Sequence, residues 1–313
     1  MSDSLVRSAR SQFWKILFGL LWLPWLIPYS CCAGDLSVLL VLSDNATPYQ
    51  TFATTFKQNL PANIRVSIQD HFESFSGNEQ QIDLVVAVGA NAGNWVAAHT
   101  SKPVLAAMLP SDKFVDLISK RHSASGLSAI FIDQPLERQA SLIRAALPGR
   151  TRIGVLHSPQ TSFDTVKLRK LLAVRDTTLI AQESSGALFD DLENLLSRSN
   201  VLLAVPDTAI YNANNFRNIM RSSYLHKIPL IGLSQSYVDA GAVCAVFSTV
   251  EQLAEQTRAA VNQFAQTRLL HEPKYPENFT IAVNRPMAQT LGIALLSPEA
   301  IREKMDKGQV EGR

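Results

Sequence analysis

The chain has 313 residues, a hydrophobic content of 46% and a formal net charge of +2 at pH 7. This length and apolar content are enough for two domains with hydrophobic cores. A net charge this close to zero gives no sign of polyanion binding, and no run of like charges suggests a nucleic-acid-binding tail. The sequence also has no short repeat and no low-complexity tract.

The N-terminus has the residue order of a secretory signal. Basic residues up to Lys15 precede the uncharged stretch Ile16–Ile27, and small residues follow at Ser30–Ala33. A basic start, an apolar middle and a small-residue exit are typical of a cleaved signal peptide. We therefore expect residues 1–33 to be removed after Ala33 and the mature chain to be secreted.

Two alternatives stay open for the same segment. The uncharged stretch Ile16–Ala33 is 18 residues long, which is near the lower limit of a membrane span, although Pro24 and Pro28 interrupt it. Lipidation at Cys31 or Cys32 is the other alternative, and the residues before these cysteines fit a lipoprotein signal poorly.

Cleavage after Ala33 would leave Cys244 as the only cysteine, so no intramolecular disulfide could form. Cys244 lies in the apolar run Ala242–Phe247. We interpret it as a small buried hydrophobic residue and not as a nucleophile.

The first part of the mature chain alternates strands and helices. Leu36–Leu42 is a continuous apolar run, which is typical of a parallel strand buried on both faces. A helix is expected at about Tyr49–Leu60 and a short one after Gly93. Further strands are expected at Asn63–Gln69, Asp83–Val88, Pro103–Met108 and Gly126–Ile132. This alternation predicts a doubly wound parallel sheet.

The pattern breaks at Asp133–Pro135, continues in a helix to about Leu147, and then repeats. The expected strands are Arg152–Leu156, Thr177–Gln182, Val201–Val205, Ile228–Leu233 and Ala242–Phe247. The expected helices between them are Ser162–Val174, Ala187–Ser197 and Ala209–Leu225. A second sheet of the same class is therefore predicted.

After the second block we expect a long helix at Val250–Leu270, a strand at Phe279–Val283 and a helix at Asn284–Leu291. The fold class predicted from these elements is α/β, with two doubly wound parallel-sheet lobes joined by a hinge. Lobe 1 would hold 34–132 plus 248–277, and lobe 2 would hold 133–247 plus 278–300. The charged residues 301–313 are expected to be frayed.

No catalytic or metal-binding motif is present. The six histidines include no H-x-x-x-H pair, and C-x-x-C, G-x-S-x-G and Walker-type phosphate-binding motifs are all absent. The segment Gly89–Gly93 has only the outer glycines of a dinucleotide-binding turn. We therefore expect no enzyme activity, no metal and no cofactor.

Polar turns at the ends of the expected strands are the candidate ligand-binding residues, because ligands of open α/β sheets bind at the carboxyl ends of strands. The candidates are Ser43, Asp44, Gly89, Ala90, Asn91, Ser111, Ser158, Asp207, Thr208, Ser234 and Gln235. Hydroxyls and N–H groups at helix starts could hold the carboxylate of a small zwitterion. Asp207 is the best candidate for its ammonium. The alternative role of Asp44, Asp112 and Asp207 is helix capping.

Several segments, in order and spacing over residues 35–296, resemble a known family. They are Val88–Ala92, Leu109–Asp112, Leu147–Gly149, Arg152–Leu156, Pro206–Thr208, Ile228–Pro229, Val238–Gly241 and Val283–Ile293. Together they are similar to ABC transporter substrate-binding proteins of the tryptophan/tyrosine-binding type. The chain departs from that family at Ala90, where a Thr is usual, and at Thr208, where an Asn is frequent.

The resemblance implies a periplasmic-binding-protein-like fold of type I that closes over a small solute. It suggests an aromatic or other hydrophobic amino acid as ligand, an ABC permease of the inner membrane as partner, and a monomer that binds no nucleic acid. Two other functions stay open. One is a periplasmic sensor or accessory protein without a transport role, and the other is a secreted α/β enzyme acting on a small metabolite.

Overall fold

The computed structural model describes residues 35–75, 80–121, 126–174 and 176–310. All of these belong to one unit of the chain. The predicted signal peptide, with its alternatives of a membrane anchor and a lipidated cysteine, lies outside the described residues. No helix among the residues that are described is both long and apolar enough to cross a membrane.

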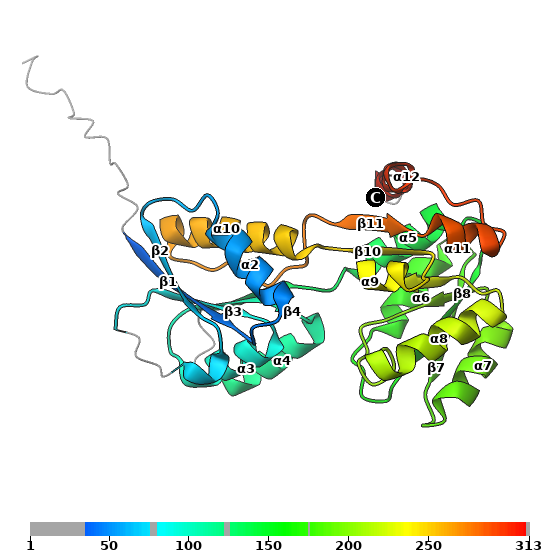
Figure 1. The fold of residues 1–313 in the computed structure, drawn as a ribbon, viewed down its shortest axis with the longest axis horizontal. Helices are drawn as coiled ribbons and strands as arrows, with labels where there is room; N and C mark the ends of the chain where they lie inside the picture. Colours follow the sequence, from blue (N-terminus) through cyan, green and yellow to red (C-terminus); the bar gives the residue numbers. More distant parts are fainter. Residues whose placement is uncertain (1–34, 76–79, 122–125, 175, 311–313) are drawn as a thin grey trace, which may run out of the picture. The chain divides into compact units, whose positions relative to one another are not determined.

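The first sheet has five parallel strands in the order β2-β1-β3-β4-β5 (Figure 1). Its strands are β1 (Leu36–Leu42), β2 (Ile64–Gln69), β3 (Leu84–Val88), β4 (Val104–Leu109) and β5 (Leu127–Phe131). Its helices are α2 (Thr47–Lys57), α3 (Ala90–His99), α4 (Phe114–Lys120) and α10 (Val250–Thr267), with short 3-10 turns η1 (Phe72–Ser74) and η2 (Ser111–Lys113).

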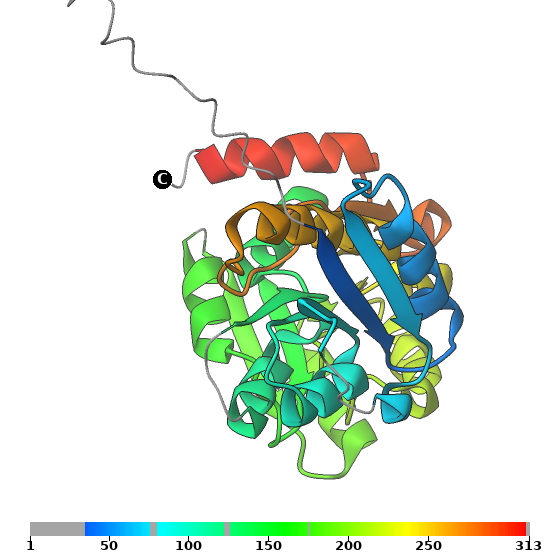
Figure 2. The ribbon, with the colours of Figure 1, turned by 90° about the vertical axis from the view of Figure 1, so that its left-hand side faces the viewer.

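Helices cover both faces of this sheet. Val38 and Leu40 pack with α2 and α10 on one face, whereas Leu39 and Val41 pack with α3 on the other (Figures 1 and 2). Alternate residues of one strand are thus buried on opposite sides, which explains why the sequence of β1 is apolar throughout.

The second sheet has six strands in the order β11-β10-β9-β8-β6-β7. They are β6 (Arg152–His157), β7 (Thr178–Glu183), β8 (Val201–Leu203), β9 (Leu230–Gly232), β10 (Cys244–Phe247) and β11 (Thr280–Val283). Its helices are α5 (Leu136–Ala146), α6 (Thr165–Ala173), α7 (Leu188–Arg198), α8 (Ala213–Leu225), α9 (Gln235–Asp239), α11 (Arg285–Thr290) and α12 (Pro298–Val310). The predicted fold class is confirmed, although β11 runs antiparallel to β10.

The long helix α10 shows how local sequence positions an element. It begins with a capping box, in which the Thr249 hydroxyl accepts from the Gln252 backbone N–H at 3.2 Å and the Gln252 side chain accepts from the Thr249 N–H at 2.9 Å. Leu253, Val261 and Phe264 then form its buried face. Helix α10 follows β10 of the second sheet, and these buried residues pack it against the first sheet.

The expectation of a frayed end from residue 301 is wrong for the residues up to 310. Helix α12 occupies this segment, and Ile301 and Met305 are 0% and 1% exposed in the core of the second sheet. The two side chains are four residues apart, so they lie on the same face of the helix and pack together although their neighbours are charged.

Helix α8 begins four residues later than expected. The Asn212 side chain accepts from the Asn214 and Asn215 N–H groups, so Asn212 is the N-cap of the helix. Helices α4 and α9 were not predicted, because each is short and has little apolar periodicity.

Three segments connect the two sheets, at residues 132–135, 248–249 and 268–279. They are bonded to one another, since Gln134 Nε2 donates to Ser248 Oγ at 3.0 Å and Ser248 Oγ donates to the Asn278 carbonyl at 2.6 Å. The predicted lobe boundaries stay a prediction, but these bonds identify where the connections contact each other.

Candidate ligand pocket

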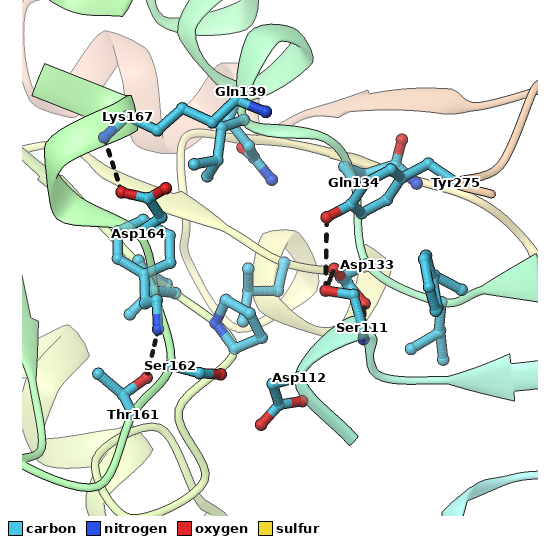
Figure 3. Close-up of a pocket in the computed structure, with 18 of the residues that line it drawn as sticks. Ser111, Asp112, Asp133, Gln134, Gln139, Thr161, Ser162, Asp164, Lys167 and Tyr275 are labelled. Carbon is cyan, nitrogen blue, oxygen red and sulfur yellow. Dashed lines mark hydrogen bonds between the residues drawn. The ribbon is translucent and has the colours of Figure 1, made fainter. Parts of the chain in front are cut away.

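A cavity of about 600 Å³ opens where the carboxyl ends of β4 and β5 meet the turn before α6 and the end of β8. Its polar side chains are Ser111, Asp112, Asp133, Gln134, Gln139, Thr161, Ser162, Asp164, Lys167 and Tyr275 (Figure 3). Its apolar residues are Val115, Phe131, Ile132, Leu136, Phe163, Leu203, Ala204, Val205, Pro206, Leu233 and Val246. This volume and this mixture are typical of a small-molecule site.

Asp133 and Ser111 are bonded to each other at one side of the cavity. The Ser111 backbone N–H donates to Asp133 Oδ1 at 2.7 Å, and the Ser111 hydroxyl donates to Asp133 Oδ2 at 2.6 Å (Figure 3). Burial raises the pKa of Asp133, whereas the bonds from Ser111 lower it and the nearby Asp112 raises it further. Asp133 is therefore a desolvated carboxylate whose hydrogen-bond partner across the cavity edge is the neutral Ser111.

Aromatic rings adjoin this carboxylate. The Phe131 and Tyr275 rings meet edge to face with centroids 5.2 Å apart, and Phe114 lies on the other side of Phe131 at 5.9 Å. The Tyr275 hydroxyl donates to Ser111 Oγ at 3.5 Å. The ring cluster and the carboxylate thus face the same cavity.

Helices α5 and α6 supply the opposite side, where Figure 3 shows Gln139 next to Lys167. Gln139 is 7% exposed, and its Oε1 has no hydrogen-bond partner. Lys167 Nζ forms an ion pair of 2.9 Å with Glu137 Oε1, and this bond raises the pKa of Lys167. The lysine charge is therefore already neutralised within the protein.

The turn before α6 closes a third side. Asp164 is the N-cap of α6, and its Oδ1 accepts from the Lys167 backbone N–H at 2.7 Å. The Thr161 hydroxyl accepts from the Phe163 N–H at 3.3 Å. Both backbone donors are thus used by side chains of the same turn.

Of the eleven residues predicted to bind ligand, only Ser111 lines this cavity, and Asp112, considered as a cap, lines it too. The structure divides the other ten between the two sheets. Ser43, Asp44, Gly89, Ala90 and Asn91 lie at the end of β1 and the start of α3, and Ser158, Asp207, Thr208, Ser234 and Gln235 follow strands of the second sheet.

The first group is packed by the protein itself. Ser43 Oγ donates to the Val88 carbonyl at 2.8 Å and accepts from the Ala92 N–H at 3.1 Å. Gly89 has a φ of +90° and lies so close to Ser43 and Tyr49 that a Cβ would approach the Tyr49 ring to 2.9 Å. Tyr49 therefore lies directly beside Gly89, and the ligand role of this group stays a prediction.

Other members of this group have local roles or face solvent. Asp44 Oδ1 accepts from the Ala46 N–H at 2.7 Å, which is a capping contact before α2. Ala90 is half-buried and Asn91 is exposed at the start of α3.

In the second group, Asp207 is 6% exposed and bonded on both oxygens. Its Oδ2 accepts from the Ser158 N–H at 2.6 Å, and its Oδ1 accepts from the Ala209 N–H at 3.0 Å. The ammonium-binding role of Asp207 stays a prediction, which this geometry disfavours.

The remaining predicted residues do not line the cavity, although Ser234 directly follows the lining residue Leu233. Thr208 is exposed, Ser234 precedes α9 without a side-chain capping bond, and the exposed Gln235 donates to Asp239 at 2.8 Å.

Sequence reasoning missed eight polar residues that line the cavity, namely Asp133, Gln134, Gln139, Thr161, Ser162, Asp164, Lys167 and Tyr275. The rule that selected Asp207 also applies to Asp133, which directly follows an apolar strand. Gln139 and Lys167 lie within helices, and Tyr275 lies in the connection before β11, so no local signal marks them.

No cluster of three metal-ligating side chains occurs in the described ranges. Cys244 is fully buried, and burial raises its thiol pKa to about 12. Its interpretation as a small core residue is therefore confirmed.

The family described as ABC transporter substrate binding protein matches residues 71–307, which is well over half of the chain. No curated protein sequence matches the chain.

Solved structures show the same fold at low identity. An ABC domain in complex with L-Trp from Streptococcus pneumonia has a TM-score of 0.61 and 15% identity, with coverage of 87% of this chain and 98% of that one. A ligand-free, open substrate-binding protein with adhesive properties from Clostridium difficile has a TM-score of 0.64 and 14% identity, with coverage of 84% and 97%. A conserved domain protein from Vibrio cholerae has a TM-score of 0.58 and 17% identity, with coverage of 86% and 98%.

The family match covers most of the chain, and the two-sheet fold agrees with the family resemblance of the sequence motifs. The chain belongs to the ABC transporter substrate-binding protein family.

Proposed function

We propose that this protein is the extracytoplasmic solute-binding component of an ABC transporter and that it binds one small solute in the cavity described above. Binding without turnover is the activity expected of the family. The proposal includes a periplasmic location, action as a monomer and delivery of the solute to a permease in the inner membrane.

The observation that carries the proposal is the composition of the cavity wall. Eleven apolar residues from both halves of the fold and ten polar residues line the same space of about 600 Å³ (Figure 3). An apolar wall binds the body of a solute, and a few placed polar groups orient it. The solute class suggested by the sequence, an aromatic or hydrophobic amino acid, is supported by a neighbour of the same fold that was solved with L-Trp.

A thermal-shift screen of the purified protein tests solute binding. The panel holds amino acids, amines, sugars and other small metabolites. A ligand that binds only the folded state at a hundredfold excess over Kd raises the free energy of unfolding by about 2.7 kcal/mol. A saturable rise in Tm with one chemical class, confirmed by calorimetry with the solute recovered unchanged, is the expected result.

Two outcomes contradict the proposal. Turnover of the bound compound would favour a secreted enzyme instead. Unchanged uptake of the identified solute in cells that lack the gene would favour a sensor or accessory protein without a transport role.

A further inference from the structure

One arginine of α5 is bonded to two of the three segments that connect the sheets. Arg138 Nη1 donates to Gln134 Oε1 at 2.5 Å, in the segment 132–135, and to the Pro276 carbonyl at 3.0 Å, in the segment 268–279. Arg138 itself does not line the ligand cavity, whereas Gln134 and Tyr275 both do. Arg138 is therefore bonded to one lining residue and to the direct neighbour of another.

The side-chain amide of Gln134 is oriented by these bonds. Its Oε1 accepts from Arg138, and its Nε2 donates to Ser248 Oγ at 3.0 Å in the third connecting segment. Gln134 is only 7% exposed, so water cannot freely replace either partner. Without Arg138 the buried oxygen would lose its donor, which is costly, and turning the amide would break the bond to Ser248. The conformation of this lining side chain therefore depends on Arg138.

The segment that carries Tyr275 is held from both sheets at this point. Gln256 of α10 is bonded twice, since its Nε2 donates to the Tyr275 carbonyl at 3.3 Å and its Oε1 accepts from the Glu277 N–H at 2.9 Å. The Pro276 carbonyl lies between these two groups in the chain and accepts from Arg138 of α5. A lining residue thus lies where the attachment of the chain changes from a helix of the first sheet to a helix of the second.

Helix α12 contributes to the position of Arg138 through an aromatic ring. Arg138 Cζ lies 4.3 Å from the centre of the Phe279 ring, and Cζ of Arg302 on α12 lies 4.0 Å from the same centre. Arg302 Nη2 also donates to the Phe279 carbonyl at 2.5 Å. Guanidinium groups are attracted to the faces of aromatic rings, and this attraction is larger where water is excluded. Phe279 therefore links α12 to Arg138.

The two guanidinium groups have no carboxylate partner among the residues that the structure describes. Burial lowers the pKa of Arg138, and the charge of Arg302 lowers it further. A cation that is removed from water is stable only if hydrogen-bond acceptors or other favourable contacts replace the water. The position of Arg138 therefore depends on its two acceptors and on the Phe279 ring.

We propose that Arg138 is a positioning residue of the ligand cavity, which fixes the lining residues Gln134 and Tyr275 from outside the cavity and is itself held by Phe279 and Arg302. This inference rests on the proposed function as a solute-binding protein. A solute that contacts either lining residue meets a side chain whose position is set before binding, so less conformational freedom is lost. Removal of the guanidinium should therefore weaken binding although it removes no contact with the solute.

The test compares two arginines of the same helix. Arg138→Met removes the hydrogen bonds and the charge but keeps an apolar side chain. The matched control is Arg144→Met, because Arg144 is also half-buried on α5 and also donates to a backbone carbonyl and to a side chain. Its acceptors, Leu171 and Ser141, do not line the cavity.

L-tryptophan, L-tyrosine and L-leucine are titrated into the full-length protein by calorimetry. We expect Arg138→Met to bind about tenfold more weakly than wild type and Arg144→Met to stay within about twofold. Arg138→Lys keeps the charge and a donor, so it should restore part of the affinity. A role in stability alone would lower the Tm without this difference in affinity.

A second pair of variants tests the contribution of α12. Arg302→Met removes the group that holds Phe279 from this helix, and we expect it to weaken binding by about threefold. Its control is Lys304→Met, which changes an exposed residue of α12 outside the ligand cavity. Equal affinities of these two variants would overturn the part of the inference that concerns Arg302.

Hydrogen exchange in the ligand-free protein is the measurement that needs no solute. The backbone amides of residues 275–280 should exchange about fivefold faster in Arg138→Met than in Arg144→Met, because the segment loses a contact only in the first variant.

The outcomes separate this inference from the proposed function. Wild-type affinity in Arg138→Met, or an equal loss of affinity in Arg144→Met, overturns the inference and leaves the proposed function standing. Failure of all three amino acids to bind the wild type contradicts the proposed solute class, and hydrogen exchange then decides the inference alone. Equal exchange rates in the two variants overturn it, and faster exchange only in Arg138→Met supports it.

Discussion

Asp133 and Asp207 have the same local chemistry but different surroundings. Each follows a parallel strand, and each accepts from the backbone N–H of a serine that follows the neighbouring strand, Ser111 in one sheet and Ser158 in the other. Asp207 is 6% exposed and does not line the cavity, whereas Asp133 does.

The comparison teaches that a carboxylate at a strand end is a site only if space remains beside it. Two backbone N–H groups satisfy Asp207, which is buried and does not line the cavity. Asp133 accepts two hydrogen bonds from Ser111, and its raised pKa reflects burial without a cation among the partners described above. The same residue type therefore connects two loops at one place and faces a ligand cavity at the other.

The largest expected effect is a loss of stability when Asp207, the buried aspartate of the two, is replaced. Asp207→Ala leaves the N–H groups of Ser158 and Ala209 without their charged acceptor, so we expect the free energy of unfolding to fall by roughly 3 kcal/mol. Urea denaturation measures this loss. Asp207→Asn, which keeps one acceptor oxygen, is expected to lose less. A variant Asp207→Ala of normal stability that no longer binds ligand would support the ligand role predicted from the sequence.

The second largest effect is a loss of stability at Gly89, which was also predicted to bind ligand. Gly89 has φ +90° and ψ 166°, a conformation almost restricted to glycine. A Cβ there would also lie 2.5 Å from Ser43 Oγ. We expect Gly89→Ala to destabilise the protein by about 2 kcal/mol.

Gly149 is the matched control for this substitution. It has φ +86°, but no atom lies within 4 Å of a Cβ built there, so Gly149→Ala introduces backbone strain without a clash. Both variants are compared by thermal denaturation. Equal losses would show that the space beside Gly89 is not closed by Ser43 and Tyr49.

A smaller effect is expected in the pH dependence of stability, and it comes from Asp133. Its folded pKa is raised above the unfolded value because of burial, so the native state holds this proton more tightly than the unfolded state does. Protonated Asp133 therefore stabilises the native state. This contribution to the free energy of unfolding is complete below the unfolded pKa of 3.8, and it is lost as pH rises through the folded pKa. The polar groups nearest to the Asp133 carboxyl are those of Ser111, Asp112 and Tyr275.

Denaturation at a series of pH values, with Asp133→Asn as the comparison, isolates this contribution. The difference in stability between wild type and variant should fall as pH rises across that window. A difference that is independent of pH would mean that Asp133 is no more desolvated than an ordinary surface aspartate, and the contrast with Asp207 would then rest on shape alone.

The smallest effect is expected at Lys167. Its ion pair with Glu137 is about half exposed on both sides, so we expect Lys167→Met to change stability by less than about 0.5 kcal/mol. Because Glu137 already pairs with this ammonium, we expect the affinity for an amine or an amino acid to change by less than about threefold. Calorimetry with an amine and its amino acid measures both effects. Weaker binding of the amino acid would show that Lys167 holds a carboxylate.

Much of the fold could be predicted from the sequence because its signals are local. Apolar runs such as β1, and the polar turns that end them, report directly on buried parallel strands. The end of the chain could not be predicted in this way, because the charges of α12 outweigh the pair Ile301 and Met305, which only the neighbouring core reveals.

The site was less predictable than the fold. Ser111 was found because the strand-end rule is local, and Asp133 follows the same rule although it was read only as a break between lobes. Gln139, Lys167 and Tyr275 reach the cavity from two helices and a connecting segment that are distant in sequence. No spacing links them, since only packing brings them to one place.

The sequence by itself determined the α/β class and the family resemblance, because hydrophobic periodicity and short motifs depend on neighbouring residues. The tertiary structure alone decided which strand-end carboxylate faces open space. Tyr49 lies directly beside Gly89, and Asp207 is buried and does not line the cavity, whereas Asp133 borders it. That difference is one of packing, which arises from residues far apart in the chain.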